Sequence, residues 1–114
     1  MVTADDVRAV ALSLPRAYEA LVRDQVKFRV GRIVFASLSR DETVMGFGFP
    51  REERAALIES EPEKFFWPLP SDMRYQWVAA RLGALEVAEL REVLTDAWCM
   101  CVPKYVRTAY FESL

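Results

Sequence analysis

The sequence predicts an α+β domain built on a mainly antiparallel sheet. Residues 26–49 read as three consecutive strands joined by short turns. Helical patterns of apolar residues precede and follow this stretch, over residues 3–14 and 86–102. Gly31-Arg32 fits a two-residue hairpin turn, because glycine supplies the positive φ that such a turn needs at its first position. Neighbouring strands are therefore expected to run antiparallel.

The N-terminal helix is expected to follow Thr3, which suits the N-cap position. Asp6, three residues later, makes a short version of the capping box. Pro15 ends this helix because proline lacks the backbone N–H and clashes with the preceding turn. The next segment, residues 18–22, fits either a first strand or a loose turn.

The central strands are indicated by alternation. Residues 26–30 alternate apolar and basic side chains, which is the period-two pattern of a half-buried strand. Further strands are expected over residues 33–38 and 43–49. In the last of these, Gly46 and Gly48 fall on one face, which favours close approach by a helix, another backbone or a ligand.

The second half of the chain mixes helices with one more strand. A helix is expected over residues 51–60, a stiff aromatic loop over 65–70 and a fourth strand over 74–82. The clearest helix spans residues 86–102, because apolar side chains recur on one of its faces. A proline then ends or kinks it, and residues 104–111 suit a short last helix.

Length and charge narrow the class of protein. At 114 residues the chain is expected to form a single domain, residues 1–114. A net charge of -2 gives no global basic field that would attract nucleic acid or an anionic membrane. No apolar run is long enough for a membrane span, and the acidic N-terminus is unlike a signal peptide. The cytoplasm is therefore the expected compartment.

Reactive groups are sparse. The absence of histidine removes the commonest general base, the usual Ser-His and Cys-His nucleophile systems and most zinc sites. Cys99 and Cys101 lie two apart on a predicted helix, so their thiols point to different sides. The carboxylates fit helix starts and solvated faces, and no pair is singled out. The sequence thus predicts no catalytic residue, metal site or cofactor.

Basic side chains give the leading functional hypothesis. Lys27 and Arg29 lie on the polar face of the first hairpin, Arg32 lies at its tip, and Arg74 begins the predicted fourth strand. Such a ribbon could follow a phosphate backbone while nearby aromatic side chains stack on bases. The alternative is an ordinary solvated strand face whose long side chains cover apolar surface. Because acidic residues nearly balance the basic ones, a nucleic-acid site would be a local patch.

Aromatic side chains give the second hypothesis, a module that binds a small molecule or a protein. Phe66 and Trp67 in the aromatic loop, with Tyr75 and Trp77 in the fourth strand, could line a pocket beside the glycine-bearing strand face. Aromatic stripes also form cores, and that is the alternative. A third possibility, a small enzyme, finds no supporting constellation of residues.

Several short motifs, in order, resemble the MmcQ/YjbR-like family. They are LSLP at residues 12–15, FRVGRIVFA at 28–36, RYQWV at 74–78 and VPK at 102–104. The resemblance spans nearly all of residues 3–110. It implies a CyaY-like fold, in which helices cover one face of a mainly antiparallel sheet in a double-wing arrangement. It also implies DNA binding, a role assigned to the family largely by fold comparison.

The chain departs from the family pattern in two places. A segment that often contains histidine before the hairpin reads Arg-Asp-Gln-Val at residues 23–26, so any role of that histidine does not carry over. The position after Gly31 is Arg32 rather than lysine, which keeps a cation. From residues and resemblance together, we expect a small non-enzymatic DNA-binding domain that uses the basic hairpin face.

Overall fold

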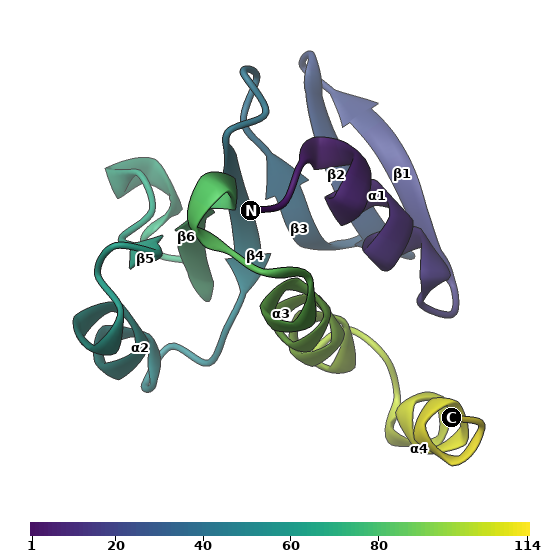
Figure 1. The fold of residues 1–114 in the computed structure, drawn as a ribbon. Coiled ribbons are helices and arrows are strands. Elements are labelled where there is room, and N and C mark those ends of the chain that lie inside the picture. The colour runs from purple at the N-terminus through teal and green to yellow at the C-terminus, as the bar shows by residue number, and fades with distance from the viewer.

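The computed structural model describes residues 1–114 and confirms the α+β class, with helices at both ends of the chain and between strands (Figure 1). In chain order the elements are α1 (Ala4–Ser13), β1 (Ala17–Val22), β2 (Gln25–Val30), β3 (Ile33–Leu38), β4 (Val44–Gly48), α2 (Arg54–Ser60), β5 (Phe65–Phe66), the 3-10 turn η1 (Pro70–Asp72), β6 (Trp77–Arg81), the 3-10 turn η2 (Leu82–Ala84), α3 (Val87–Cys99) and α4 (Lys104–Glu112). Thr3 caps α1 as expected, because its side chain accepts the N–H of Asp6 and the Asp6 carboxylate accepts the N–H of Thr3.

All six strands join one sheet in the order β1-β2-β3-β4-β6-β5, and every neighbouring pair is antiparallel. The ambiguous segment at residues 18–22 is part of β1. It pairs with β2 through a two-residue turn in which Arg23 and Asp24 both have positive φ, at 52° and 65°. Gly31, with φ of 60°, makes the predicted hairpin turn between β2 and β3.

α1 and α3 lie on one face of this sheet, and the core fills the space between (Figure 1). Buried side chains come from α1 (Val7, Val10, Ala11), from the strands (Phe28, Phe35, Ala36, Leu38, Met45, Phe47, Val78, Ala80) and from α3 (Leu90, Leu94, Ala97, Trp98). The buried indole of Trp98 donates its Nε1–H to the Pro15 carbonyl at 2.8 Å. This bond ties α3 to the link between α1 and β1.

The region of residues 65–82 differs from its prediction. The aromatic loop is shorter than expected, because Phe65 and Phe66 form β5 and pair with Ala80 and Ala79. The fourth strand, β6, begins at Trp77 rather than at Arg74. The physical reason is that carbonyls of this segment bind a buried arginine of α2, described below, and so leave the sheet ladder.

The C-terminal helices also differ from the helices that the sequence predicts. α3 ends at Cys99, before the expected residue 102, and Val87 at its start is exposed. α4 lies beyond α3, apart from the sheet (Figure 1). It is held by Val106 and by the edge of the Tyr110 ring on Trp98, with ring centroids 5.1 Å apart. None of the helices has both the length and the apolar character that a membrane crossing requires.

Candidate nucleic-acid interface

The face of the sheet away from the helices, called here the helix-free face, carries two of the predicted basic residues. In β2 the buried Phe28 and Val30 point into the core, so the alternate residues Lys27 and Arg29 point the other way. A bulge in β3 leaves Phe35 unpaired, and it matches Phe28 with Ala36 and Arg29 with Val34. The two cations therefore stay on one face despite the irregularity.

Neither Lys27 nor Arg29 is neutralised by an acid. The side-chain ion pairs of the molecule use only Arg8 and Lys64 as cations. The Arg29 Nε is shielded from solvent and has no hydrogen-bond partner. A shielded donor of this kind is normally satisfied. The terminal nitrogens of Arg29 are not shielded and make no hydrogen bond, so they are free to donate to an anionic partner.

The other two predicted cations lie off this face. Arg32 is exposed at the tip of the β2–β3 hairpin. Arg74 lies in the turn before β6, not in the strand, and its guanidinium carbon is 4.8 Å from the centre of the Tyr75 ring. Since β2 ends and β6 begins at the same end of the sheet, both flank that end rather than the centre of the face.

The four predicted aromatic residues separate into two groups. Phe66 and Trp77 are half-buried on strands, where Phe66 pairs with Ala79 and Trp77 with Gly48. Ala79 is buried but lies outside the main core, so Ala79 and the residues paired with it lie on the helix-free face. Trp67 and Tyr75, by contrast, lie in the connecting segment and are 44% and 46% exposed, so they face solvent.

The two glycines of β4 meet different neighbours. A Cβ at Gly46 would lie 3.1 Å from the Ser37 Oγ and 3.4 Å from a ring carbon of Trp77. Gly46 thus gives the Trp77 indole room to lie on β4. A Cβ at Gly48 would instead be 3.9 Å from the Ala97 Cβ of α3, which is the helix contact that the sequence favoured as one explanation.

One cross-strand row organises the helix-free face. Register pairs Lys27 with Ser37, Ser37 with Gly46, and Gly46 with Ala79, and Phe66 completes the row from β5. Sequence analysis did not include Arg81, whose guanidinium carbon lies 4.4 Å from the centre of the Phe66 ring. The sequence could have indicated Arg81, because residues 77, 79 and 81 alternate onto the same face of a strand.

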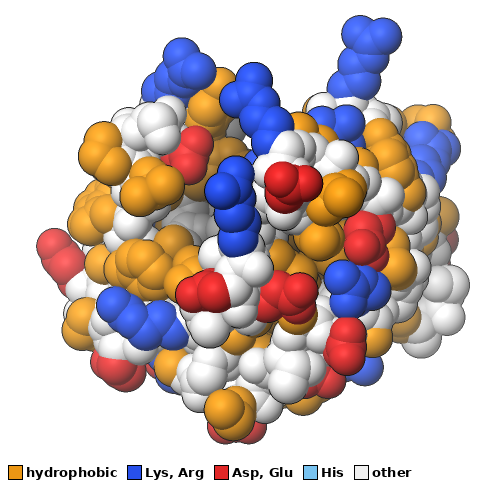
Figure 2. Space-filling model, turned by 90° about the horizontal axis from the view of Figure 1, so that it is seen from above, with side chains coloured by type: hydrophobic (Ala, Val, Ile, Leu, Met, Phe, Trp, Pro, Cys, Tyr) orange, Lys and Arg blue, Asp and Glu red, His pale blue; other side chains and the backbone are white.

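The helix-free face bears cations and no carboxylate. By alternation and register its strand positions are Tyr18, Ala20, Val22, Gln25, Lys27, Arg29, Val34, Ser37, Val44, Gly46, Phe66, Trp77, Ala79 and Arg81. The acid of β1, Glu19, points to the helices and pairs with Arg8 at 2.7 Å. Figure 2 looks down on the molecule of Figure 1, and its upper margin is the side behind the sheet. Lys and Arg side chains line much of that margin, and others lie among the acidic side chains at the middle and lower edge.

Arg54 of α2 fixes the segment that leads into β6. Its side chain is 7% exposed and has no acidic partner. It donates to the carbonyls of Met73, Tyr75 and Trp77 at 3.0, 2.9 and 3.2 Å, and its guanidinium carbon lies 5.2 Å from the centre of the Trp67 ring. One buried cation therefore sets where β6 begins and how Trp77 enters the sheet.

Comparison with known proteins identifies the family. The model of the YjbR family matches residues 12–100. The chain belongs to the YjbR family. Uncharacterized proteins of Mycobacterium tuberculosis and Mycobacterium bovis are similar to it, at 31% identity over 131 aligned positions that cover 99% of this chain and 98% of each relative.

A solved structure shares the fold of this YjbR-family chain. The crystal structure of a Deinococcus radiodurans protein with the DUF419 domain superposes with a TM-score of 0.78. It covers 96% of this chain and 88% of that one at 22% sequence identity. The similarity at this identity concerns the fold.

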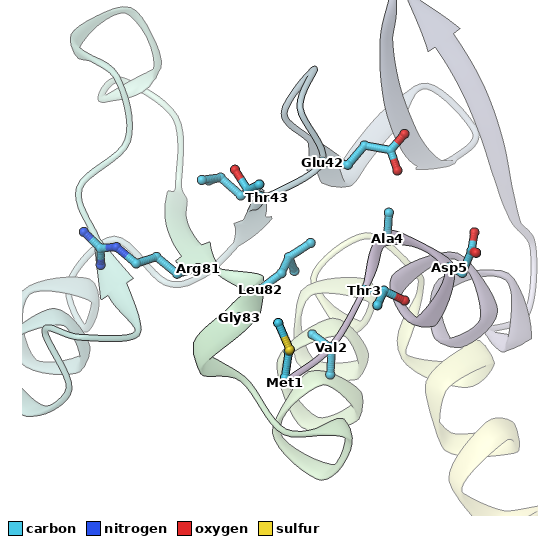
Figure 3. Close-up of a pocket in the computed structure, with 11 residues that line it drawn as sticks. Met1, Val2, Thr3, Ala4, Asp5, Glu42, Thr43, Arg81, Leu82 and Gly83 are labelled. Atoms are coloured by element: carbon cyan, nitrogen blue, oxygen red, sulfur yellow. The ribbon is translucent and has the colours of Figure 1, made fainter.

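The YjbR-family chain also has a shallow cavity at the other end of the sheet. It has a volume of about 630 Å³ and lies between the N-terminal residues 1–5, the β3–β4 turn and η2 (Figure 3). In Figure 3 the carboxylates of Asp5 and Glu42 lie on one side and Arg81 on the other. Mixed charge and an open rim give this cavity no set of converging polar groups that would define a ligand.

Three titratable groups of this YjbR-family chain that lie outside the helix-free face have pKa values shifted by their surroundings. Burial raises the pKa of both thiols, Cys99 and Cys101, which keeps them protonated and poorly reactive. Hydrogen bonds from Ser39 and Thr43 lower the pKa of Asp41 and hold the β3–β4 turn. No group of three histidine, cysteine or acidic side chains is placed to hold a metal ion.

Proposed function

We propose that this protein is a nucleic-acid-binding domain whose contact surface is the helix-free face, with DNA as the first ligand to test. The observation that carries the proposal is the placement of Lys27 and Arg29, unpaired and adjacent, on a face whose strand positions hold no carboxylate. Phosphate contacts by Lys and Arg supply most of the affinity in non-specific nucleic-acid binding. Arg32 and Arg74 flank this surface and extend the positive area toward one end of the sheet.

Local charge supports the proposal although the net charge is -2. Interactions between exposed charges fall off over about 8 Å at physiological ionic strength, so a ligand on one face feels mainly that face. Apart from Glu19, which points to the helices, the acidic residues lie in helices and in the segments that connect the elements. The family resemblance adds an expectation of DNA binding that rests on fold comparison.

The test is fluorescence anisotropy of labelled DNA, offered both as a duplex and as a single strand, across a salt series. We expect micromolar binding at low salt that weakens as salt rises, with a slope set by the number of phosphates contacted. The double variant Lys27→Glu/Arg29→Glu should abolish binding of either form. Replacing Arg32 or Arg74 singly with alanine should weaken binding and reduce the salt slope by about 1 each.

A charge-matched control separates a site from a general charge effect. Arg91 and Lys104 are exposed on α3 and α4 and pair with no carboxylate. The variant Arg91→Glu/Lys104→Glu changes the net charge by the same amount as the β2 variant and should bind DNA nearly as well as the wild type. Binding that is absent at low salt, or lost equally in both variants, contradicts the proposal.

The second candidate function is a module for a small molecule or protein, now centred on the connecting segment. The observation that favours it is the exposure of Trp67, Leu69 and Tyr75 close together in the chain, with Leu69 70% exposed. The test is a thermal-shift screen of metabolites, in which we expect a ligand to raise the melting temperature of the wild type. Trp67→Ser and Tyr75→Ser should abolish that shift. DNA binding that survives both changes keeps the two functions apart.

A further inference from the structure

We propose that the helix-free face binds single-stranded nucleic acid, with a base stacked on Trp77 and phosphates held by Lys27 and Arg29. The inference rests on the proposed function and names its ligand class. It depends on two features of the face that a simple basic patch lacks. One is an aromatic ring supported by the sheet, and the other is a guanidinium that makes no ion pair and no hydrogen bond within the molecule.

Trp77 provides a stacking platform that is fixed before any ligand arrives. Its ring carbons Cε3 and Cζ3 lie 3.4 and 3.6 Å from the position that a Cβ of Gly46 would occupy, so one side of the indole rests on β4. The residue is half-buried, so part of its surface remains open to a ligand. Arg54 holds the carbonyl of Trp77 itself at 3.2 Å. A held ring loses little freedom when a base stacks on it, which favours affinity.

Arg29 provides the anion contact. Its register neighbours are Tyr18 on β1 and Val34 on β3, neither of which offers a carboxylate. The Tyr18 hydroxyl donates to the Gly31 carbonyl and is thus engaged at the hairpin. A phosphate oxygen would accept from the terminal nitrogens of Arg29, which are not shielded, and Lys27, two positions away on the same face, would hold the neighbouring phosphate.

The arrangement favours a single strand over a duplex. A stacked duplex hides the faces of its bases, so only an unpaired base can lie on Trp77. β2 and β6 are separated by β3 and β4, which at the usual strand spacing puts the cations and the ring about 14 Å apart. A strand of a few nucleotides crossing the sheet would span this distance. Phe66 with Arg81 on its ring continues the same face at the far edge.

The experiment compares a labelled oligothymidylate of about twelve nucleotides with a labelled duplex of the same length, for wild type and variants. We expect the wild type to bind the single strand at least tenfold more tightly than the duplex. Trp77→Leu should weaken single-strand binding about tenfold and leave the salt slope unchanged, because it removes stacking and no charge. Trp77→Phe should retain most of the affinity, and Trp67→Leu, an exposed aromatic of the connecting segment, should bind as the wild type does.

A second measurement does not depend on how well Trp77→Leu folds. In a Trp67→Phe background the remaining indoles are Trp77 and Trp98, and Trp98 is fully buried in the core. Quenching of fluorescence by unlabelled oligothymidylate then reports on Trp77 alone, and we expect it to saturate with the anisotropy signal.

The outcomes separate the two proposals. A preference for duplex, or single-strand binding without Trp77 quenching, overturns the single-strand inference and leaves the nucleic-acid proposal standing. Binding of neither DNA form overturns both. Single-strand binding with quenching that is lost in Lys27→Glu/Arg29→Glu supports both.

Discussion

At the scale of single residues, Arg54 is the side chain whose removal we expect to cost most. A buried arginine that donates to three carbonyls leaves those carbonyls unsatisfied when it is truncated. Arg54→Ala should lower the free energy of unfolding by about 2–4 kcal/mol in urea denaturation. Arg54→Lys should recover only part of this, because an ammonium cannot present the same fork of donors.

Arg51 is the matched control for that prediction. It also donates to a carbonyl of the same segment, that of Arg74, but its side chain is exposed. Arg51→Ala should therefore change the free energy of unfolding by less than about 0.5 kcal/mol. Equal losses for the two variants would mean that burial of Arg54 has no special role.

Gly46 supports a second prediction at the same scale. The γ-methyl groups of a valine at this position would collide with Ser37 and with the Trp77 ring, since the Cβ alone comes within 3.1 and 3.4 Å of them. Gly46→Val should lower stability by about 1–3 kcal/mol and shift the Trp77 emission to the red as the indole leaves β4. Gly83→Val, with nothing within 4 Å of its Cβ position, should show neither effect.

These residues show where sequence reasoning stops. Alternation correctly placed Lys27 and Arg29 on the polar face of β2, because a period of two is a local property of the chain. The role of Arg54 could not be predicted, because its partners lie 19 to 23 positions away. They are backbone carbonyls, which every residue has, so the sequence does not mark them. The late start of β6 follows from the same contacts and was missed for the same reason.

At the scale of elements, an ion pair clamps β5 to α3. The Lys64 ammonium beside β5 lies 2.5 Å from Glu89 of α3 and 3.0 Å from Glu61. The Glu89 carboxylate also accepts the N–H of Glu86, which closes the capping box of α3. The Lys64 hydrogen bond, with help from the Glu86 N–H, lowers the pKa of Glu89 below its ordinary 4.5.

The clamp predicts a definite pH dependence. A carboxylate with a lowered folded pKa contributes stability that is present above its unfolded pKa, about 4.5, and is lost as pH falls through the folded value. Glu89→Gln should therefore melt a few degrees below the wild type at neutral pH, and this gap should narrow in more acidic buffer. Glu59→Gln, on the exposed face of α2, should show no gap at either pH. A Glu89→Gln gap that widens with acid would contradict the assignment.

Elements also explain which part of the candidate site could be predicted. The sequence indicated the strands of residues 26–49 in order, and a hairpin joins each to the next. It did not indicate that β6 lies beside β4, or that β5 closes the far edge, because both pairings join segments distant in the chain. The row from Lys27 to Phe66 depends on those pairings. Its residues were therefore predicted singly, and their meeting on one face was not.

At the scale of the whole molecule, the helices and the candidate interface occupy opposite sides of the sheet. Core packing of α1 and α3 can thus be maintained by one set of strand residues while the alternate set contacts a ligand. α4 is the exception to this compact arrangement. It touches the rest of the molecule through Val106, the Tyr110 ring and a bond of 3.2 Å from Arg107 to the Cys99 carbonyl. The guanidinium carbon of Arg16 also lies 5.8 Å from the centre of the exposed Tyr105 ring.

This attachment predicts that α4 opens without the rest of the molecule. Few buried contacts mean a low free energy of local opening, so the α4 amides should exchange hydrogen at least about tenfold faster than those of α3 and β3. Tyr110→Ala should speed exchange in α4 and leave the sheet unchanged, whereas Glu112→Gln, a change at an exposed side chain of the same helix, should alter neither. If Tyr110→Ala speeds exchange equally in α1 and α3, then α4 belongs to the global cooperative unit. If α4 opens alone, the helix-free face should keep its geometry, because the residues that hold α4 do not contact the strands of that face.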